Sequence, residues 1–233
     1  MVRAELLRRS PLRILESTVH GGPGKGNLAA VVAHKGVGKT AFLVHLATFQ
    51  LLKDRHVIHV SFATRTDHIT EWYESIFTEV ARRAKLEGVM EIHDEIIRNR
   101  VLMNFNQSTV EVDRITSSMA AMIGQGHFAA EQVVVDGYDF GHAAAQSIRT
   151  FRQFARDMNL EIWFSVSLPR DSPPPSRGSI PSLMEAFAPD FSTIIALRSE
   201  EGFVSLELLK DHDVSPLPEL RLKLDPKTLL VSE

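Results

Sequence analysis

Residues 33–40 read Ala-His-Lys-Gly-Val-Gly-Lys-Thr, and this stretch decides which fold is expected. It matches the phosphate-binding loop motif G-x-x-x-x-G-K-[ST] except at the first position, where Ala33 replaces glycine. The motif requires a strand before the loop and a helix after it. Residues 27–33 are apolar without alternation, as in a buried strand, and the mostly apolar residues after Thr40 are predicted to form a helix. Alanine fits this first position if its φ is negative, because a Cβ atom penalises positive φ.

The loop residues have distinct expected roles toward a nucleoside triphosphate. Main-chain N–H groups would wrap the phosphates, Lys39 would reach the outer phosphates, and the Thr40 hydroxyl would ligate Mg²⁺. The helix that opens at Lys39 adds the positive end of its dipole. The expected nucleotide-binding residues are His34, Lys35, Gly36, Val37, Gly38, Lys39, Thr40 and Ala41. The expected nucleotide is ATP or GTP; the alternative is a glycine-rich turn with an accidental lysine.

Asp136 is the second candidate metal ligand. It ends a predicted strand, residues 131–136, that contains three successive valines. In an open parallel sheet, ligands bind at the carboxyl ends of the strands, so Asp136 can complete the Mg²⁺ shell beside Thr40. The alternative is an aspartate that only begins a turn with Gly137.

The composition limits the classes of protein to which the chain can belong. Its 233 residues suit one domain, residues 1–233, and 44% hydrophobic and 24% charged residues are typical of soluble globular proteins. Because the net charge is −3, any nucleic-acid contact would need a local basic patch. The chain has no cysteine, no secretory hydrophobic segment at its N-terminus and no run of about 20 apolar residues. These features predict a cytoplasmic protein with no membrane span.

Strands are predicted to alternate with helices along the chain. After residues 27–33, further strands are predicted at residues 55–63, 100–105, 131–136 and 161–168. Helices are predicted from Lys39, from Thr66 or Asp67 to Gly88, at residues 91–98, from a capping box at residues 108–111 to Gly124, and at residues 143–158. This alternation predicts an α/β fold with a mainly parallel sheet flanked by helices.

Three segments depart from this alternation. Residues 1–20 are predicted as a short helix or strand followed by a linker, and form an N-terminal extension. Residues 169–181 hold five prolines and are predicted as a long loop. Residues 191–197 and 203–210 are predicted to form a C-terminal antiparallel hairpin, with residues 220–224 and 229–231 as candidates to extend it.

Two groups of side chains have both a structural and a functional interpretation. Trp72 and Tyr73 are able to stack on bases, but their helical spacing favours core packing. Arg170 and Arg177 in the proline-rich loop are able to contact single-stranded DNA. The neighbouring Asp171 dilutes their charge, however, and the loop has no aromatic residue to stack on a base. The sequence therefore favours core packing for the first group and a stiff surface loop for the second.

Three stretches together resemble the RecA-like ATPases, nearest the KaiC branch. Residues 21–40 resemble the family's glycine-rich approach to its phosphate-binding loop, and residues 131–136 resemble its Walker B strand. Residues 206–212, Leu-Glu-Leu-Leu-Lys-Asp-His, resemble a family strand that ends in Lys-x-Arg. The likeness spans about residues 13–213 and implies a RecA-like fold.

The resemblance implies a role between subunits for the end of the terminal hairpin. Family members use the Lys-x-Arg pair to reach the γ-phosphate bound by the neighbouring subunit. Lys210 fits the lysine, but His212 stands at the arginine and lacks its fixed charge and planar fork. The implied partners are further copies of this chain or a related ATPase subunit.

The chain departs from the family after the second predicted strand. The family carries adjacent glutamates there, one of which polarises the attacking water, whereas this chain has Ala63 and Thr64. Neither is able to act as a general base near neutral pH. Asp67 and Asp139 are the candidate substitutes, but their spacing does not assure the role. We therefore expect nucleotide binding with weak or absent hydrolysis, and a nucleotide that regulates assembly or the binding of a protein partner.

Three other functions stay open from the sequence. The first is an active, DNA-stimulated ATPase of recombination or helicase type. The second is a MinD/ParA-like ATPase, although His34 stands where that class has its signature lysine and 27 residues precede Leu28. The third is a degenerate scaffold that binds no nucleotide.

Overall fold

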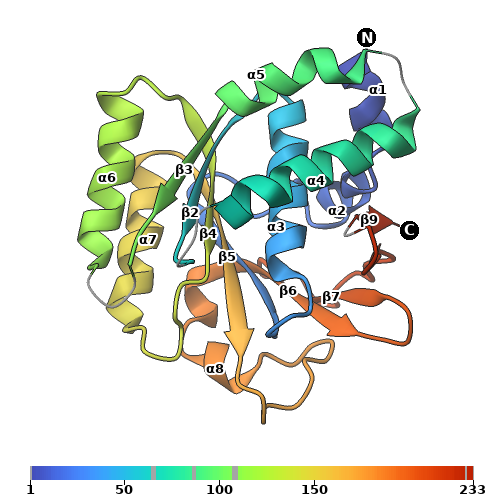
Figure 1. Cartoon of the computed structure of the whole chain (residues 1–233). Helices are drawn as coiled ribbons and strands as arrows, with labels where there is room; N and C mark the ends of the chain where they lie inside the picture. The colour runs from blue at the N-terminus through green and yellow to red at the C-terminus, as the bar shows by residue number, and fades with distance from the viewer. Residues whose placement is uncertain (1, 64–66, 86–87, 107–109, 229, 233) are drawn as a thin grey trace.

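The computed structural model describes residues 2–63, 67–85, 88–106, 110–228 and 230–232 (Figure 1). Five expectations fall partly outside these residues. They concern Thr64 at the position of a family glutamate, Thr66 as a helix cap, residues 86–87 of the helix predicted to reach Gly88, residues 108–109 of the capping box, and residue 229 of the candidate strand 229–231.

The described residues form one mixed sheet and two layers of helices. The strands are β1 (Asn27–His34), β2 (His56–Ser61), β3 (Arg100–Asn104), β4 (Ala130–Asp136), β5 (Glu161–Leu168), β6 (Phe191–Ser199), β7 (Val204–Asp211), β8 (Lys223–Leu224) and β9 (Val231–Ser232). The α-helices are α1 (Val2–Arg9), α2 (Leu12–Thr18), α3 (Lys39–Leu52), α4 (Asp67–Ala84), α5 (His93–Arg98), α6 (Val112–Gly124), α7 (Ala145–Asp157) and α8 (Ser182–Glu185). Two 3-10 helices, η1 (Val89–Ile92) and η2 (Ala188–Asp190), complete the fold.

The sheet has the order β3-β2-β4-β5-β1-β6-β7-β8-β9. The pairs from β3 to β6 are parallel, whereas β6 to β9 pair antiparallel. This arrangement confirms the predicted mainly parallel sheet and the terminal hairpin, which the two short strands β8 and β9 extend. β1 lies between β5 and β6, so the loop that follows it leaves the sheet near its middle.

The pleat of β1 divides its side chains between two hydrophobic cores. Ala29, Val31 and Ala33 face a core built with α1 to α5, and the alternate residues face a core built with α6 to α8. Figure 1 shows the two helix layers on opposite faces of the sheet. Helix α3 is buried almost all round, because α1 and α4 cover the side that the sheet leaves open.

The N-terminal residues agree with the predicted short helix, but a second helix replaces part of the linker predicted after it. Residues 2–18 form two helices, α1 and α2, which bury Leu6, Leu12 and Leu15 in the core that also holds α3. The linker prediction was wrong for residues 12–18, because Leu12 and Leu15 are too few for helical periodicity to stand out in the sequence. Their burial depends on a surface of α3 that lies more than 20 residues further along the chain.

Two helix boundaries also differ from their predicted positions. Helix α4 ends at Ala84 rather than at Gly88, because Lys85 has left-handed backbone (φ 49°). Helix α6 begins at Val112, and Glu111 is an extended cap residue without a side-chain capping bond. The capping box therefore does not start this helix. The amide of Val110 bonds to the Asn106 carbonyl at 3.1 Å.

Across the ranges that the structure describes, no helix is both long enough and apolar enough to cross a bilayer.

Candidate functional site

The loop between β1 and α3 has the backbone conformation that its two glycines allow. Gly36 (φ 86°) and Gly38 (φ 114°) are left-handed, a region that residues with a Cβ atom rarely enter. Ala33 is still part of β1, where it pairs with Ser167, and its φ is not positive. The condition for alanine at the first motif position is therefore met. The loop leads directly into α3, whose first turn carries Lys39 and Thr40.

Lys39 is folded back over the loop. Its Nζ donates hydrogen bonds to the carbonyl oxygens of Ala33 (3.1 Å) and His34 (2.9 Å), and the residue is only 8% exposed. Burial lowers the pKa of Lys39 to about 8, although the nearby Asp136 carboxylate opposes the shift. The hydrogen-bond partners of the Lys39 ammonium group are therefore two neutral carbonyls. An anionic oxygen would make a stronger hydrogen bond to this group than either carbonyl does.

Thr40 and Asp136 lie together, as expected for a shared metal ion. The Thr40 hydroxyl donates to Oδ2 of Asp136 at 2.8 Å, and the aspartate is 8% exposed at the carboxyl end of β4. One hydroxyl and one carboxylate are oxygen ligands of the kind that Mg²⁺ takes from a protein when phosphates and waters supply the others. The described residues contain no group of three or more His, Asp or Glu side chains that would hold a metal without such help.

The carboxyl end of β2 is the place where the family glutamates would stand. The amide of Phe62 donates to the Asp136 carbonyl (3.0 Å), so the end of β2 lies directly beside Asp136. The next residue, Ala63, is exposed, and its amide bonds to the Ser61 hydroxyl at 3.1 Å. The residue at this position therefore offers no carboxylate.

The two substitute aspartates are in different settings. Asp139 accepts the Gly141 amide (2.9 Å) and contacts Nδ1 of His142 (2.7 Å) in a local turn. The hydrogen bond from His142 is the main reason that the pKa of Asp139 is lowered, and a lowered pKa makes this carboxylate a weaker base. Asp67 is the first residue of α4, where its carboxylate accepts the His68 amide at 3.2 Å.

Lys210 and His212 lie at the other end of the sheet from the loop. Lys210 pairs with Ile194 of β6, and Ile194 pairs with Ala30, the fourth residue of β1. The Lys210 Nζ donates to the Ala188 carbonyl at 2.8 Å, and burial lowers its pKa. Nε2 of His212 lies 3.2 Å from the Pro23 carbonyl. Ala188 precedes β6 and Pro23 precedes β1, so both side chains are directed away from the carboxyl end of the sheet, where the loop lies.

Two arrangements of polar side chains were missed by the sequence reasoning. Asp211 is fully buried and contacts an imidazole on each side, His20 at 3.0 Å and His212 at 2.8 Å. His59 is also fully buried and shares a 3.1 Å hydrogen bond with the Tyr73 hydroxyl. No spacing signal points to the contact between His20 and Asp211, because 191 residues separate them.

The proline-rich loop lies against the rest of the chain at two points. Nε2 of His34 is 3.1 Å from the Ser172 carbonyl, and the Arg177 guanidinium donates to the Leu217 carbonyl. The first contact places residues 169–181 beside the loop 33–40. The second occupies one of the two arginines that were candidates for contact with single-stranded DNA.

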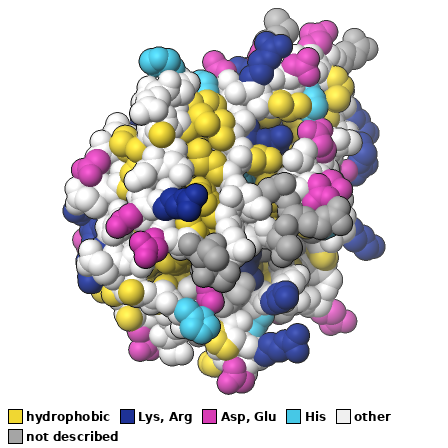
Figure 2. Space-filling model, turned by 60° about the vertical axis from the view of Figure 1, so that its left-hand side comes forward, with side chains coloured by type: hydrophobic (Ala, Val, Ile, Leu, Met, Phe, Trp, Pro, Cys, Tyr) yellow, Lys and Arg dark blue, Asp and Glu magenta, His cyan; other side chains and the backbone are white. Residues whose placement is uncertain are grey.

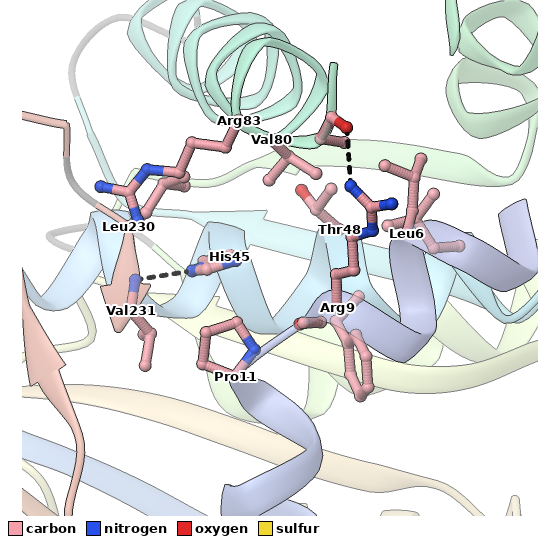
Figure 3. A pocket seen from close by; sticks show the side chains of 13 residues that line it. Leu6, Arg9, Pro11, His45, Thr48, Val80, Arg83, Leu230 and Val231 are labelled. Carbon is pink, nitrogen blue, oxygen red and sulfur yellow. Dashed lines mark hydrogen bonds between the residues drawn. The ribbon is translucent and has the colours of Figure 1, made fainter. Parts of the chain in front are cut away.

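A mainly apolar cavity lies elsewhere in the molecule. It has a volume of about 170 Å³ and is bounded by α1, α3, α4 and β9 (Figure 3). Its walls are mainly apolar, with Leu6, Phe49, Val80 and Leu230 among the lining residues. None of the residues of the loop 33–40 lines it, so it is not the candidate phosphate site.

No model of a known protein family matches the chain, and no curated protein matches it.

Proposed function

We propose that this protein binds a nucleoside triphosphate, ATP or GTP, with Mg²⁺ at the loop 33–40 of a RecA-like fold. The observation that carries the proposal is the 2.8 Å contact between Thr40 and Asp136. These residues are 96 positions apart, and each is the residue that its own motif predicts as a metal ligand. A glycine-rich turn with an accidental lysine gives no reason for this meeting.

Different residues of the site would contact different parts of the Mg²⁺–nucleotide complex. The amides of residues 34–41 would face the phosphates, and Lys39 would exchange the carbonyls of Ala33 and His34 for phosphate oxygens. Thr40 and Asp136 would hold the metal from the protein side. When bound, Mg²⁺ would neutralise charge on the outer phosphates. The left-handed glycines support this proposal, because they let the backbone turn sharply around an anion.

The same site favours binding over hydrolysis. Ala63, where the resemblance implies a catalytic glutamate, follows Phe62, whose amide bonds to the Asp136 carbonyl, and the Asp139 carboxylate is held by Gly141 and His142. No base is therefore positioned by these residues to activate a water molecule. We infer a cytoplasmic protein whose bound nucleotide regulates its assembly or its contact with a protein partner.

A thermal-unfolding panel tests the proposal. Mg²⁺ with ATP, ADP, GTP or GDP is added to the protein, and a nucleotide at about 100 times its dissociation constant should add about 2.7 kcal/mol to the free energy of unfolding. The Lys39→Ala variant should lose most of this gain, because it loses the charge nearest the outer phosphates. The control is Lys25→Ala. It also removes one positive charge, but from an exposed lysine that precedes β1 and pairs with Glu131 of β4. If none of the four nucleotides changes the free energy of unfolding, the proposal is wrong.

A further inference from the structure

The C-terminal residues touch the loop 33–40. A Cβ atom built on Gly38 would lie 2.7 Å from Cδ2 of Leu224, which is closer than side-chain carbons normally approach. Leu224 is fully buried and belongs to the same hydrophobic core that Val37 packs against. Val37 and Gly38 of the loop therefore both lie against the hydrophobic core that contains Leu224 of β8.

A short hairpin holds Leu224 in this position. Leu224 pairs with Val204 on one side and with Val231 of β9 on the other. The amide of Asp225 donates to the Leu230 carbonyl at 3.0 Å, which closes the hairpin. We refer to residues 223–228 and 230–232 as the C-terminal hairpin, which is distinct from the hairpin formed by β6 and β7.

The C-terminal hairpin is fastened to two helices next to the loop. The amide of Val231 donates to Nδ1 of His45 on α3 at 3.1 Å, a contact visible in Figure 3. Burial lowers the pKa of His45 to about 3, so this imidazole stays neutral and able to accept. On α4, the Arg83 guanidinium donates to Asp225 (3.3 Å) and to Thr228 (2.7 Å). Gly38 is the cap residue of α3, and the hairpin that carries Leu224 bonds to His45 of α3. Both sides of the contact between Leu224 and Gly38 are therefore attached to the same helix.

The glycines explain why such a contact matters. Left-handed and right-handed backbone are about equally accessible to glycine, so Gly36 and Gly38 leave the loop free to adopt other conformations. A Cβ built on Gly36 meets no atom within 4 Å, whereas the same atom on Gly38 meets Leu224. The packing of Leu224 against Gly38 therefore restrains the second glycine and not the first.

We propose that Leu224 is a positioning residue for the phosphate-binding loop, and that docking of the C-terminal hairpin sets the affinity for nucleotide. This inference rests on the proposed function. If the loop holds the binding conformation for only a fraction of the time, the apparent dissociation constant rises by the inverse of that fraction. Loss of the leucine side chain would lower the fraction and weaken binding, without removing any group that touches the nucleotide.

The test compares two leucine truncations in the full-length chain. Leu224→Ala removes the contact with Gly38, whereas Leu222→Ala removes a leucine of similar burial (2% exposed) that lies outside the 4 Å shell of that glycine. Calorimetric titration with Mg²⁺ and the nucleotide that stabilises the parent protein gives the dissociation constants, and thermal unfolding gives stability. We expect at least a fivefold rise in the constant for Leu224→Ala and less than twofold for Leu222→Ala. Leu224→Met should recover most of the affinity.

Each outcome decides between the two proposals. Equal effects of the two truncations, or no effect of either, would overturn the positioning role while leaving nucleotide binding intact. A parent protein that binds no nucleotide would overturn both. If Leu224→Ala does not fold, Leu224→Val replaces it, with an expected rise of at least twofold and the same control.

Discussion

At the scale of single residues, burial sets the charge of groups at both ends of the sheet. Lys39 at the carboxyl end is held by two carbonyls, and burial lowers its pKa to about 8. Glu161 lies at the other end, 7% exposed, and accepts a 2.7 Å hydrogen bond from Gln132 Nε2. Burial raises the pKa of Glu161 to about 7, and the bond from Gln132 opposes this shift.

Glu161 should make stability depend on pH. Its pKa is about 7 in the folded protein and about 4.5 in the unfolded chain, so between these values the folded state retains a proton that the unfolded chain has lost. The free energy of unfolding should therefore fall as pH rises from about 4.5, by roughly 3 kcal/mol in all, and level off above about 7.

The Glu161→Gln variant should lose this dependence. Its new amide is also able to donate to the Gln132 Oε1 atom, which is buried without a partner among the described residues. Urea unfolding at pH 5 and pH 8 measures the effect, and the variant should gain stability relative to the parent at pH 8. A difference between the two proteins that is the same at both pH values would contradict the assignment.

Single residues also show where the sequence was insufficient. The sequence predicted Thr40 and Asp136 as metal ligands because each lies in a local motif with a known context. It did not indicate that His59 would be fully buried against Tyr73, since a histidine on a strand has no preferred face without its neighbours. The burial of His59 follows from the packing of α4 over β2.

At the scale of elements, the strands were the most predictable part of the fold. β5 has the predicted bounds, residues 161–168, because its run of apolar residues lies between clear turns. The core packing predicted for Trp72 and Tyr73 is confirmed on α4, where Tyr73 is buried and Trp72 packs against the same core. The errors were at helix ends and at the N-terminus, where a turn or a distant surface decides the conformation.

The N-terminal helices should contribute to stability although they precede the sheet. Leu12 of α2 is fully buried in the core that α3 shares. Leu12→Ala should lower the free energy of unfolding by about 2–5 kcal/mol, because it removes transfer energy and leaves a cavity. Urea unfolding checks this value, with Arg13→Ala on the exposed side of the same helix as the control. A loss below about 0.5 kcal/mol would mean that residues 2–18 are an independent appendage.

At the scale of the whole molecule, the charge distribution bears on nucleic-acid binding. On the face shown in Figure 2, lysine and arginine side chains are scattered among acidic ones and form no continuous basic patch. The net charge is −3. Phosphate backbones are held by clustered positive charge, so this face gives no support to a DNA-stimulated ATPase. An ATPase assay with and without single-stranded DNA separates that function from the one proposed.

Assembly is the whole-molecule property that nucleotide should change. The Lys210 Nζ is bonded to the Ala188 carbonyl, away from the loop of its own chain, so a role at the γ-phosphate would involve the loop of a neighbouring subunit. We expect a larger particle with Mg²⁺ and ATP than without, and a smaller increase for Lys210→Ala than for the exposed control Lys227→Ala. Sizing by light scattering measures this, and a monomer unchanged by nucleotide would refute it.

The sequence by itself determined the features that depend on neighbouring residues. These are the glycine loop between a strand and a helix, the alternation of strands and helices, and the hairpin at residues 191–211. Only the tertiary structure decided that Thr40 meets Asp136, that Leu224 packs against Gly38, and that His20 and His212 share Asp211. The physical reason is range: turns and periodicity act over a few residues. Contacts between residues 96 or 191 positions apart depend on strand order and on how the helices cover the sheet.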